Sequence, residues 1–256
     1  MNLFQAVGRS TLSLLRTTGG VALFALQGVR AILMPPYYPG QLARQILQIG
    51  YLSLPVVGLT ALFTGAPLAL NIDTGGGRFN AAQIVPQIVA LGITRELGPV
   101  LAALMLAGRV SAAIAAEIGA MRATEQIDAL QTLSTDPFRY LVAPRLLAAI
   151  LTLPLLTAVA DIIGIAGGWV VATASLDFNS ATYIRSTWQF MKPWDVESGL
   201  IKAAAFGFIV ALMGAYHGYT ASGGARGVGR ATTHAVVSAA VLIFAADFVL
   251  TSLFTK

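Results

Sequence analysis

The feature that most limits the fold of this chain is a series of long runs that carry almost no charge. A helix needs roughly 20 residues to cross about 30 Å of hydrocarbon. Five runs reach that length, at residues 45–70, 79–109, 146–176, 203–221 and 231–255. Only 11% of the residues are charged, against about 25% in a soluble domain. The sequence therefore predicts an all-α integral membrane protein, with residues 1–256 forming a single membrane domain.

Four ionisable residues interrupt these runs. Arg95 and Glu96 lie in the second, Asp161 in the third and Asp247 in the fifth. An unpaired charge at the bilayer centre costs at least about 2.5–3.5 kcal/mol, so these side chains must face protein or water. Arg95 and Glu96 are about 100° apart around a helix, which predicts different surroundings for each. Two interpretations of Arg95 stay open: a polar element of a substrate path, or a buried ion pair with Asp161 or Asp247.

The N-terminal region has a shorter apolar run. The segment TTGGVALFALQGV has only 13 residues between Arg16 and Arg30, which is short for a membrane span. We expect residues 1–34 to form a helix that lies in the membrane interface; a sixth span and a signal segment are the alternatives. Prolines 35, 36 and 39 should end this helix before the first span.

Lysine and arginine counts predict the orientation. With the N-terminus inside, ten basic residues lie on the cytoplasmic side and five on the other, and the positive-inside rule favours this arrangement. The C-terminus is then outside. The ten are Arg9, Arg16, Arg30, Arg44, Arg109, Arg122, Arg139, Arg145, Arg226 and Arg230, and the five are Arg78, Arg185, Lys192, Lys202 and Lys256.

The segment EIGAMRATEQIDAL, residues 117–130, is unusually polar for this chain, and the topology puts it in the cytoplasm. Apolar residues three or six apart suggest one stripe of a helix, with charged residues on its other faces. The pattern fits an amphipathic helix on the membrane face or an ordinary solvated loop helix. The apolar set is Ile118, Met121, Ile127, Leu130 and Leu133, and the charged set is Glu117, Arg122, Glu125 and Asp128.

Catalytic motifs are poorly supported. GARGVGRA at 224–231 resembles a phosphate loop, but Arg230 and Ala231 replace its lysine and hydroxyl residue, so we expect a flexible turn between the fourth and fifth spans. His217 and His234 lie in different segments, neither with a second ligand at helical spacing, so no metal site is expected. The chain has no cysteine, and its basic residues do not cluster as nucleic-acid binding requires.

Small residues at four-residue spacing predict close helix contacts. GIAGG at 164–168 and GAYHG at 214–218 both contain Gly-x-x-x-Gly. Such rows let helix backbones approach in lipid. They fit either packing within the chain or a subunit interface.

Several strings together resemble one family, the MlaE (YrbE) permeases of ABC transporters that move phospholipids or related lipids with MCE-domain proteins. They occur in family order from about residue 45 to the end of the chain. The strings are RELGPVLAALMLAGR at 95–109, AAEIGAMRATEQIDAL at 115–130, DPFRYLVAPR at 136–145, LPLLT at 153–157, GRATT at 229–233 and DFVLT at 247–251.

The resemblance implies a five-span permease of the bacterial inner membrane that works as a homodimer. ATP and magnesium would bind a separate cytosolic ATPase, and this chain would carry no cofactor. Residues 117–135 match the family's coupling helix, which docks on that ATPase through Glu117, Met121, Arg122, Glu125, Gln126 and Asp128. The outer side would face a periplasmic MCE-domain protein, and whether a STAS-domain protein joins the ATPase stays open.

The resemblance also implies a lipid pocket between the two permease subunits. Its polar lining matches Arg95 and Glu96, with Leu97 beside them, and Lys202 matches a basic position near the external opening. The end of the first span would contribute Leu68, Leu70 and Ile72. Two other functions remain open: an ion-coupled secondary transporter that uses Glu96, Asp161 and Asp247, and a noncatalytic scaffold for the MCE protein.

Overall fold

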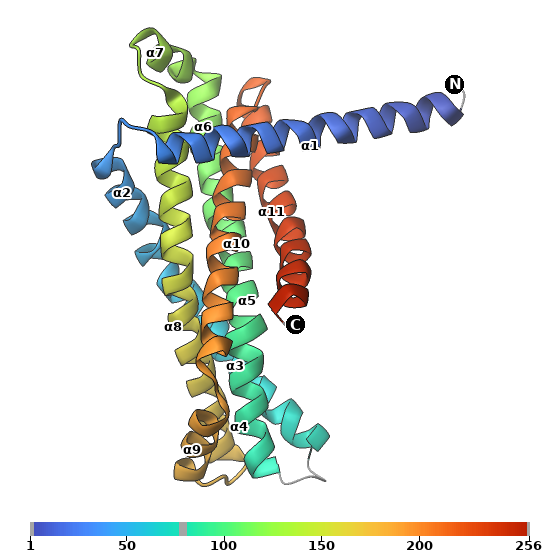
Figure 1. Cartoon of the computed structure of the whole chain (residues 1–256), viewed down its shortest axis with the longest axis vertical. Coiled ribbons are helices and arrows are strands. Elements are labelled where there is room, and N and C mark those ends of the chain that lie inside the picture. The colour runs from blue at the N-terminus through green and yellow to red at the C-terminus, as the bar shows by residue number, and fades with distance from the viewer. Residues whose placement is uncertain (1–2, 77–80, 255–256) are drawn as a thin grey trace.

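The computed structural model describes residues 3–76 and 81–254, and within them every regular element is a helix (Figure 1). Arg78, Lys256 and residues 79, 80 and 255 of the predicted spans lie outside the described residues. The elements are α1 Leu3–Leu33, α2 Pro39–Ile49, η1 Tyr51–Ser53, α3 Leu54–Gly76, α4 Ala81–Gly92, η2 Ile93–Leu97, α5 Gly98–Leu106, η3 Ala107–Ser111, α6 Ala112–Ala123, α7 Gln126–Thr132, η4 Phe138–Val142, α8 Ala143–Ser175, α9 Ser180–Phe190, α10 Pro193–Tyr219 and α11 Gly224–Phe254.

Five helical stretches are long and apolar enough to cross a membrane, and each overlaps one of the five apolar runs. The chain is therefore an all-α, multi-pass membrane protein. The stretches are Pro39–Gly75, Gln83–Ala123, Phe138–Ser175, Pro193–Tyr219 and Gly224–Phe254.

The N-terminal helix α1 runs across the bundle near one end, nearly perpendicular to the long helices (Figure 1). Phe24 fixes it there, because its buried ring contacts the rings of Phe138, Tyr216 and Tyr219. Much of the helix is uncovered, with apolar side chains such as Leu23 and Leu26 exposed. Among the described residues, α1 is not one of the five stretches long and apolar enough to cross a membrane; its position in the membrane interface stays a prediction.

The second spanning stretch is longer than the sequence predicted. The helix continues past Arg109 to Ala123, which is 123 − 109 = 14 further residues, through the π-helical turns η2 and η3. The prediction of one separate helix over 117–135 is therefore wrong. Residues 117–123 are the last turns of α6, and α7 follows after a turn at Thr124 and Glu125.

Two other boundaries also differ from the prediction. The segment GARGVGRA is not a flexible turn, because α11 begins at Gly224; the turn is Thr220–Gly223, and Gly223 has a φ of 90°. The fourth stretch begins at Pro193 rather than at residue 203, so Lys202 lies inside α10. The buried Lys202 can lie inside α10 because neighbouring helices supply Glu96 and Asp247 as partners.

Glycines bring the central helices into contact. A methyl group on Gly65 of α3 would overlap the carbonyl oxygen of Gly164 in α8. Gly214 of α10 packs against Ser111, where a methyl group would lie 2.8 Å from the carbonyl oxygen. Both Gly-x-x-x-Gly motifs therefore pack helices within this chain, as small residues do in membranes.

Candidate functional site

The candidate site is built around a buried charge, the ammonium group of Lys202, whose side chain is only 2% exposed. It donates hydrogen bonds to the carbonyl oxygen of Arg95 (3.0 Å), to Glu96 Oε2 (2.9 Å) and to Thr251 Oγ1 (2.6 Å). Asp247 Oδ1 also lies 3.1 Å from Nζ but has no hydrogen bond, so this contact is ionic. We call Lys202, Glu96, Asp247 and Thr251 the lysine cluster. It joins η2, α10 and α11.

Local sequence explains why a carbonyl oxygen is free to join this cluster. Pro99 has no N–H, so it cannot donate to the carbonyl oxygen of Arg95 four residues earlier. The π-helical turn η2 ends just before it. Gly199 lets α10 come close, because a methyl group there would overlap the carbonyl oxygen of Thr94. Lys202, one turn further along α10, then supplies the missing donor.

Arg95 points to different partners from those of its neighbour Glu96. Its Nη1 lies 3.8 Å from Asp195 Oδ1, and its side chain is 27% exposed, whereas that of Asp195 is 9% exposed. The predicted ion pair of Arg95 with Asp161 or Asp247 is therefore wrong. Asp195 was missed because α10 begins earlier than predicted; its Oδ2 also accepts a hydrogen bond from the N–H of Lys192 and so caps that helix.

Asp161 lies apart from these ion pairs, in the middle of α8. It is 6% exposed, and neither carboxyl oxygen has a hydrogen-bond partner in the described part of the chain. Its neighbour is Gly98, where a methyl group would overlap Oδ1. The three acidic residues suggested as ion carriers are therefore divided: Glu96 and Asp247 share Lys202, and Asp161 is separate from them.

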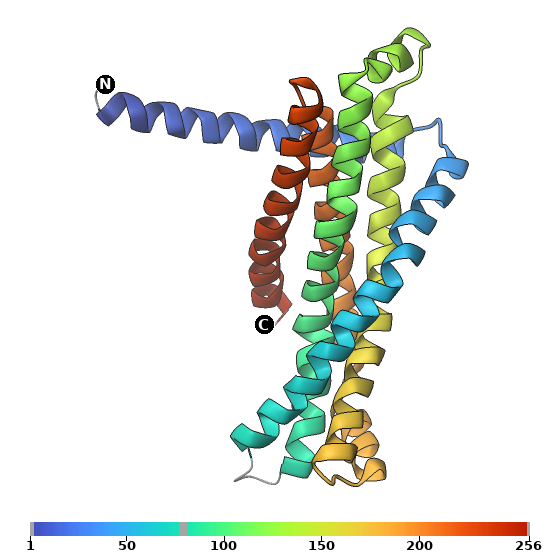
Figure 2. The same ribbon diagram turned by 180° about the vertical axis from the view of Figure 1, so that it is seen from behind.

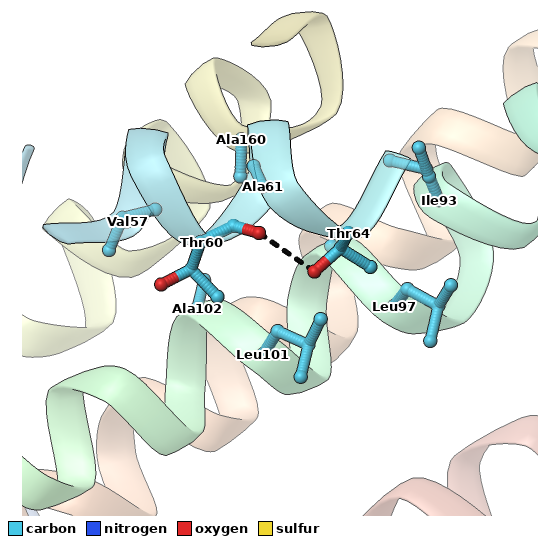
Figure 3. A pocket seen from close by; sticks show the side chains of 10 residues that line it. Val57, Thr60, Ala61, Thr64, Ile93, Leu97, Leu101, Ala102 and Ala160 are labelled. Atoms are coloured by element: carbon cyan, nitrogen blue, oxygen red, sulfur yellow. Dashed lines mark hydrogen bonds between the residues drawn. The ribbon is translucent and has the colours of Figure 1, made fainter. Parts of the chain in front are cut away.

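A narrow cavity lies between α3, η2, α5 and α8 (Figure 3). We call it the central groove. Its volume of about 10 Å³ admits one water molecule at most. Thr60 and Thr64 give it two hydroxyl groups, each bonded to the carbonyl oxygen four residues earlier, and Leu97 and Leu101 lie opposite them. In the sequence, this polar wall of the groove is indicated by two threonines one helical turn apart within an apolar run.

The three residues of the first span that were predicted to line a lipid pocket do not lie together. Leu68 and Ile72 pack in a separate core, around Ala69, Val89 and Tyr183, at the end of the bundle that α4 and α9 form. Leu70 is exposed instead. Of the predicted lining, the structure brings together Arg95, Glu96 and Lys202, places Leu97 in the central groove, and leaves the other three elsewhere.

Comparison with known proteins identifies the family. The profile described as "Permease MlaE" matches residues 42–253. A Rickettsia bellii protein named "Probable ABC transporter permease protein" is 50% identical over 256 residues, covering 100% of this chain and 99% of the relative. The Haemophilus influenzae "Intermembrane phospholipid transport system permease protein MlaE" is 34% identical over 261 residues, covering 99% and 97%. The chain belongs to the MlaE permease family.

Another relative belongs to a plant. The Arabidopsis thaliana protein "TRIGALACTOSYLDIACYLGLYCEROL 1, chloroplastic" is 36% identical over 234 residues, covering 91% of this chain and 67% of the relative. Together these matches make the chain a transporter subunit of the permease type.

The second notable region of the MlaE-family permease is the tip formed by α7, which projects beyond the level of α1 (Figure 1). Ile127 is fully buried and fixes the helix to the bundle. Leu133 is 75% exposed, so it does not pack against the bundle as Ile127 does. Glu125 has a φ of 59°, a left-handed conformation that is uncommon for residues other than glycine.

The predicted coupling residues have different surroundings. Glu117 pairs with the buried Arg145 (Oε2 to Nη2, 2.8 Å), and Arg122 pairs with Asp128 across the tip (Nη1 to Oδ1, 2.7 Å). Met121 packs against the core. Glu125 and Gln126 are exposed. Asp128 is exposed as well, and the side chains of Glu117 and Arg122 remain 53% and 39% exposed despite their ion pairs. Glu117 differs from the tip residues because its partner, Arg145, is buried in the bundle.

The two histidines of the permease lie together, contrary to the expectation from their positions in the sequence. The rings of His217 on α10 and His234 on α11 stack at 5.9 Å, and His217 Nε2 lies 3.0 Å from Ser238 Oγ. Within residues 3–76 and 81–254, no group of three potential metal ligands is found.

Proposed function

We propose that this permease moves phospholipids across or out of the bacterial inner membrane, as a homodimer driven by a separate cytosolic ATPase. The observation that carries the proposal is Arg95, a partly exposed cation inside a spanning stretch, two residues before Leu97, which lines the central groove. The name of the Haemophilus relative, a phospholipid transport permease, supports the same substrate class. A phosphate diester needs such a cation, and its acyl chains need apolar walls.

Arg95 and Lys202 have different roles in this proposal. The ammonium group of Lys202 has three hydrogens, and all three are used within the chain. The contact of Arg95 with Asp195 is loose at 3.8 Å. We therefore assign the phosphate contact to Arg95 and a supporting role to Lys202, which holds η2 against α10 and α11.

A second copy of the chain would complete the lipid site. The central groove of one chain has no room for an acyl chain. Figure 2 shows α3, α5, α6 and α11 along one face. Large apolar side chains of α11, such as Phe244 and Phe248, are exposed. Two such faces opposite each other would enclose a larger apolar space, which rigid-body movement of the subunits would open and close.

The tip formed by α7 is the proposed ATPase contact. It carries an exposed leucine, Leu133, outside the level of α1, and exposed polar groups at Glu125, Gln126 and Asp128. An exposed apolar residue with a polar rim is typical of a protein contact. ATP and magnesium would bind the partner, and nucleotide-driven movement would reach the bundle through buried Ile127.

The remaining assembly follows from the proposed orientation, with the N-terminus in the cytoplasm and the C-terminus outside. The end formed by α3, α4, α8 and α9 extends beyond the end of α11 (Figure 1). It would face a periplasmic MCE-domain protein that accepts or delivers lipid. A STAS-domain protein, where present, would bind the ATPase rather than this chain.

The lipid path is tested by Arg95→Gln in the assembled complex. Loss of a charge-assisted contact predicts about a tenfold drop in co-purified phospholipid. The melting temperature should change little, because a partly exposed, loose ion pair contributes about 0–1 kcal/mol. Arg95→Lys is the charge-retaining control. Unchanged phospholipid content in Arg95→Gln would refute the assignment.

The ATPase contact is tested by Leu133→Asp and Glu125→Lys. We expect each variant to be folded and to lose co-purified ATPase, because neither side chain packs in the bundle. Val237→Asn, an exposed apolar residue on α11, is the matched control that should keep the ATPase. Full ATPase binding by the Leu133→Asp variant would rule out the tip as the docking element.

A further inference from the structure

A second groove lies between α2 and α6, toward the end of the bundle where α1 crosses (Figure 2). We call it the α2–α6 groove. Its volume of about 220 Å³ corresponds to about seven water molecules at about 30 Å³ each. Polar groups come from Gln45, Gln48, Arg109 and Glu117, and the remaining lining residues, Ile49, Leu52, Val110, Ala113 and Ile114, are apolar.

Arg109 is the cation of this groove and has no acidic partner. Its Nη1 donates to Ser53 Oγ (2.6 Å) and to the carbonyl oxygen of Gln48 (3.3 Å), both neutral acceptors. Among the described residues, no carboxylate forms an ion pair with it. Glu117, the acidic residue of the same groove, is paired with Arg145 instead. A guanidinium has five N–H donors, so Arg109 retains donors for an anion.

The depth of Arg109 can be read from its neighbours. Gly20 and Phe24 of α1 contact Tyr216 of α10. The glycines on either side of Tyr216, Gly214 and Gly218, pack against Ser111 and Ala115. These lie two and six residues after Arg109, so Arg109 lies about 3–9 Å deeper than α1 at 1.5 Å per residue. Interfacial helices lie about 5–10 Å deep, near the headgroup boundary.

We propose that the α2–α6 groove binds the phosphate of a glycerophospholipid from the leaflet in which α1 lies, with Arg109 as its cation. Gln48 would donate to the same headgroup, and the wall formed by Ile49, Leu52 and Val110 would contact the start of an acyl chain. This site is separate from Arg95, which lies 109 − 95 = 14 residues earlier on the same helical stretch. The inference depends on the proposed function only for the membrane position of α1.

Charge and shape together favour a lipid over a free anion. A free phosphate needs donors on several sides, whereas here the polar groups share the groove with five apolar residues. A cation at or just below the headgroup boundary, with no acidic partner among the described residues, is stabilised by an anion that the membrane itself supplies. The α2–α6 groove would thus hold a lipid in the leaflet where α1 lies. Arg95 would contact the lipid phosphate at a separate point of the transport path.

The test uses the full chain in nanodiscs that contain phosphatidylglycerol with a photoactivatable group on its headgroup. Peptide mass spectrometry should detect adducts on Gln48, Leu52 or Ala113. Arg109→Gln should lower this labelling about tenfold, as expected for loss of a charge-assisted hydrogen bond, and Arg109→Lys should retain most of it. Labelling near Arg95 should not change, so failure here is distinguishable from failure of the proposed function.

Controls separate specific binding from general attraction. Arg44→Gln removes an exposed cation from the same helix, α2, without touching the groove, and should label like the wild type. Inorganic phosphate should not compete. If Arg109→Gln does not fold, Ala113→Trp provides the test, because Ala113 is exposed in the groove and a large ring would fill it. Wild-type labelling in either variant, or competition by free phosphate, would overturn the proposal.

Discussion

Lys202→Met should destabilise the permease more than removal of any other lysine described in the structure. The substitution removes three hydrogen bonds and leaves Glu96 and Asp247 without their cation. Removing one partner of a buried ion pair costs about 3–5 kcal/mol. Since Glu96 is 38% exposed and partly stabilised by solvent, we expect a value near the lower end, about 3 kcal/mol.

This free energy corresponds to a fall in melting temperature of about 6–12 °C, at about 2–4 °C per kcal/mol for chains of 150–250 residues. The assay is thermal unfolding of the purified chain in detergent, followed by fluorescence of its three tryptophans; thiol dyes are unsuitable because the chain has no cysteine. Lys192→Met is the matched control. Its side chain is exposed and only its backbone caps α10, so its melting temperature should stay near that of the wild type.

A compensated variant tests the cause of the loss. In Lys202→Met/Glu96→Gln/Asp247→Asn the two carboxylates are neutral, so no uncompensated charge remains, and at least half of the lost stability should return. A melting temperature of Lys202→Met within about 2 °C of the wild type would refute the reasoning. So would a triple variant that is no more stable than the single one.

Three further substitutions test packing and buried polar groups. Gly65→Ala should lower the melting temperature, because its methyl group would overlap Gly164 and overpacking costs about 1–3 kcal/mol; Gly75→Ala, with open space on the same helix, should not. Tyr183→Phe should be neutral or stabilising: burial raises the pKa of Tyr183 to about 12, and its hydroxyl has no partner among the described residues. Asp161→Asn should fold normally and, in the assembled complex, keep ATP-driven lipid transport, because no described cation pairs with Asp161; loss of transport would favour the ion-carrier alternative.

The sequence alone predicted the number of spans, because the length and spacing of apolar runs report directly on membrane crossing. It predicted the wrong helix boundaries where charged residues lie inside helices. Pro193 to Lys202 looked like a loop, since Asp195, Glu197 and Lys202 interrupt the apolar pattern, yet Glu96 and Asp247 make burial of Lys202 possible. Those partners come from residues more than 40 positions away.

The site was only partly predictable for the same reason. Arg95 and Glu96 stood out as intramembrane charges, but their partners depend on how α10 and α11 pack against η2. Glu117 and Glu125 looked alike in sequence, and only the fold pairs Glu117 with buried Arg145 while leaving Glu125 exposed at the tip. Helical periodicity could not distinguish them, because α6 ends between the two residues.

The central claim is that this chain is a phospholipid permease powered by another protein. The most direct measurement is transfer of labelled phospholipid out of proteoliposomes that contain the permease with its co-purified ATPase and MCE-domain protein. We predict transfer that requires ATP and stops when the Leu133→Asp variant replaces the wild type. Transfer by the permease alone that follows a proton gradient without ATP would contradict the account.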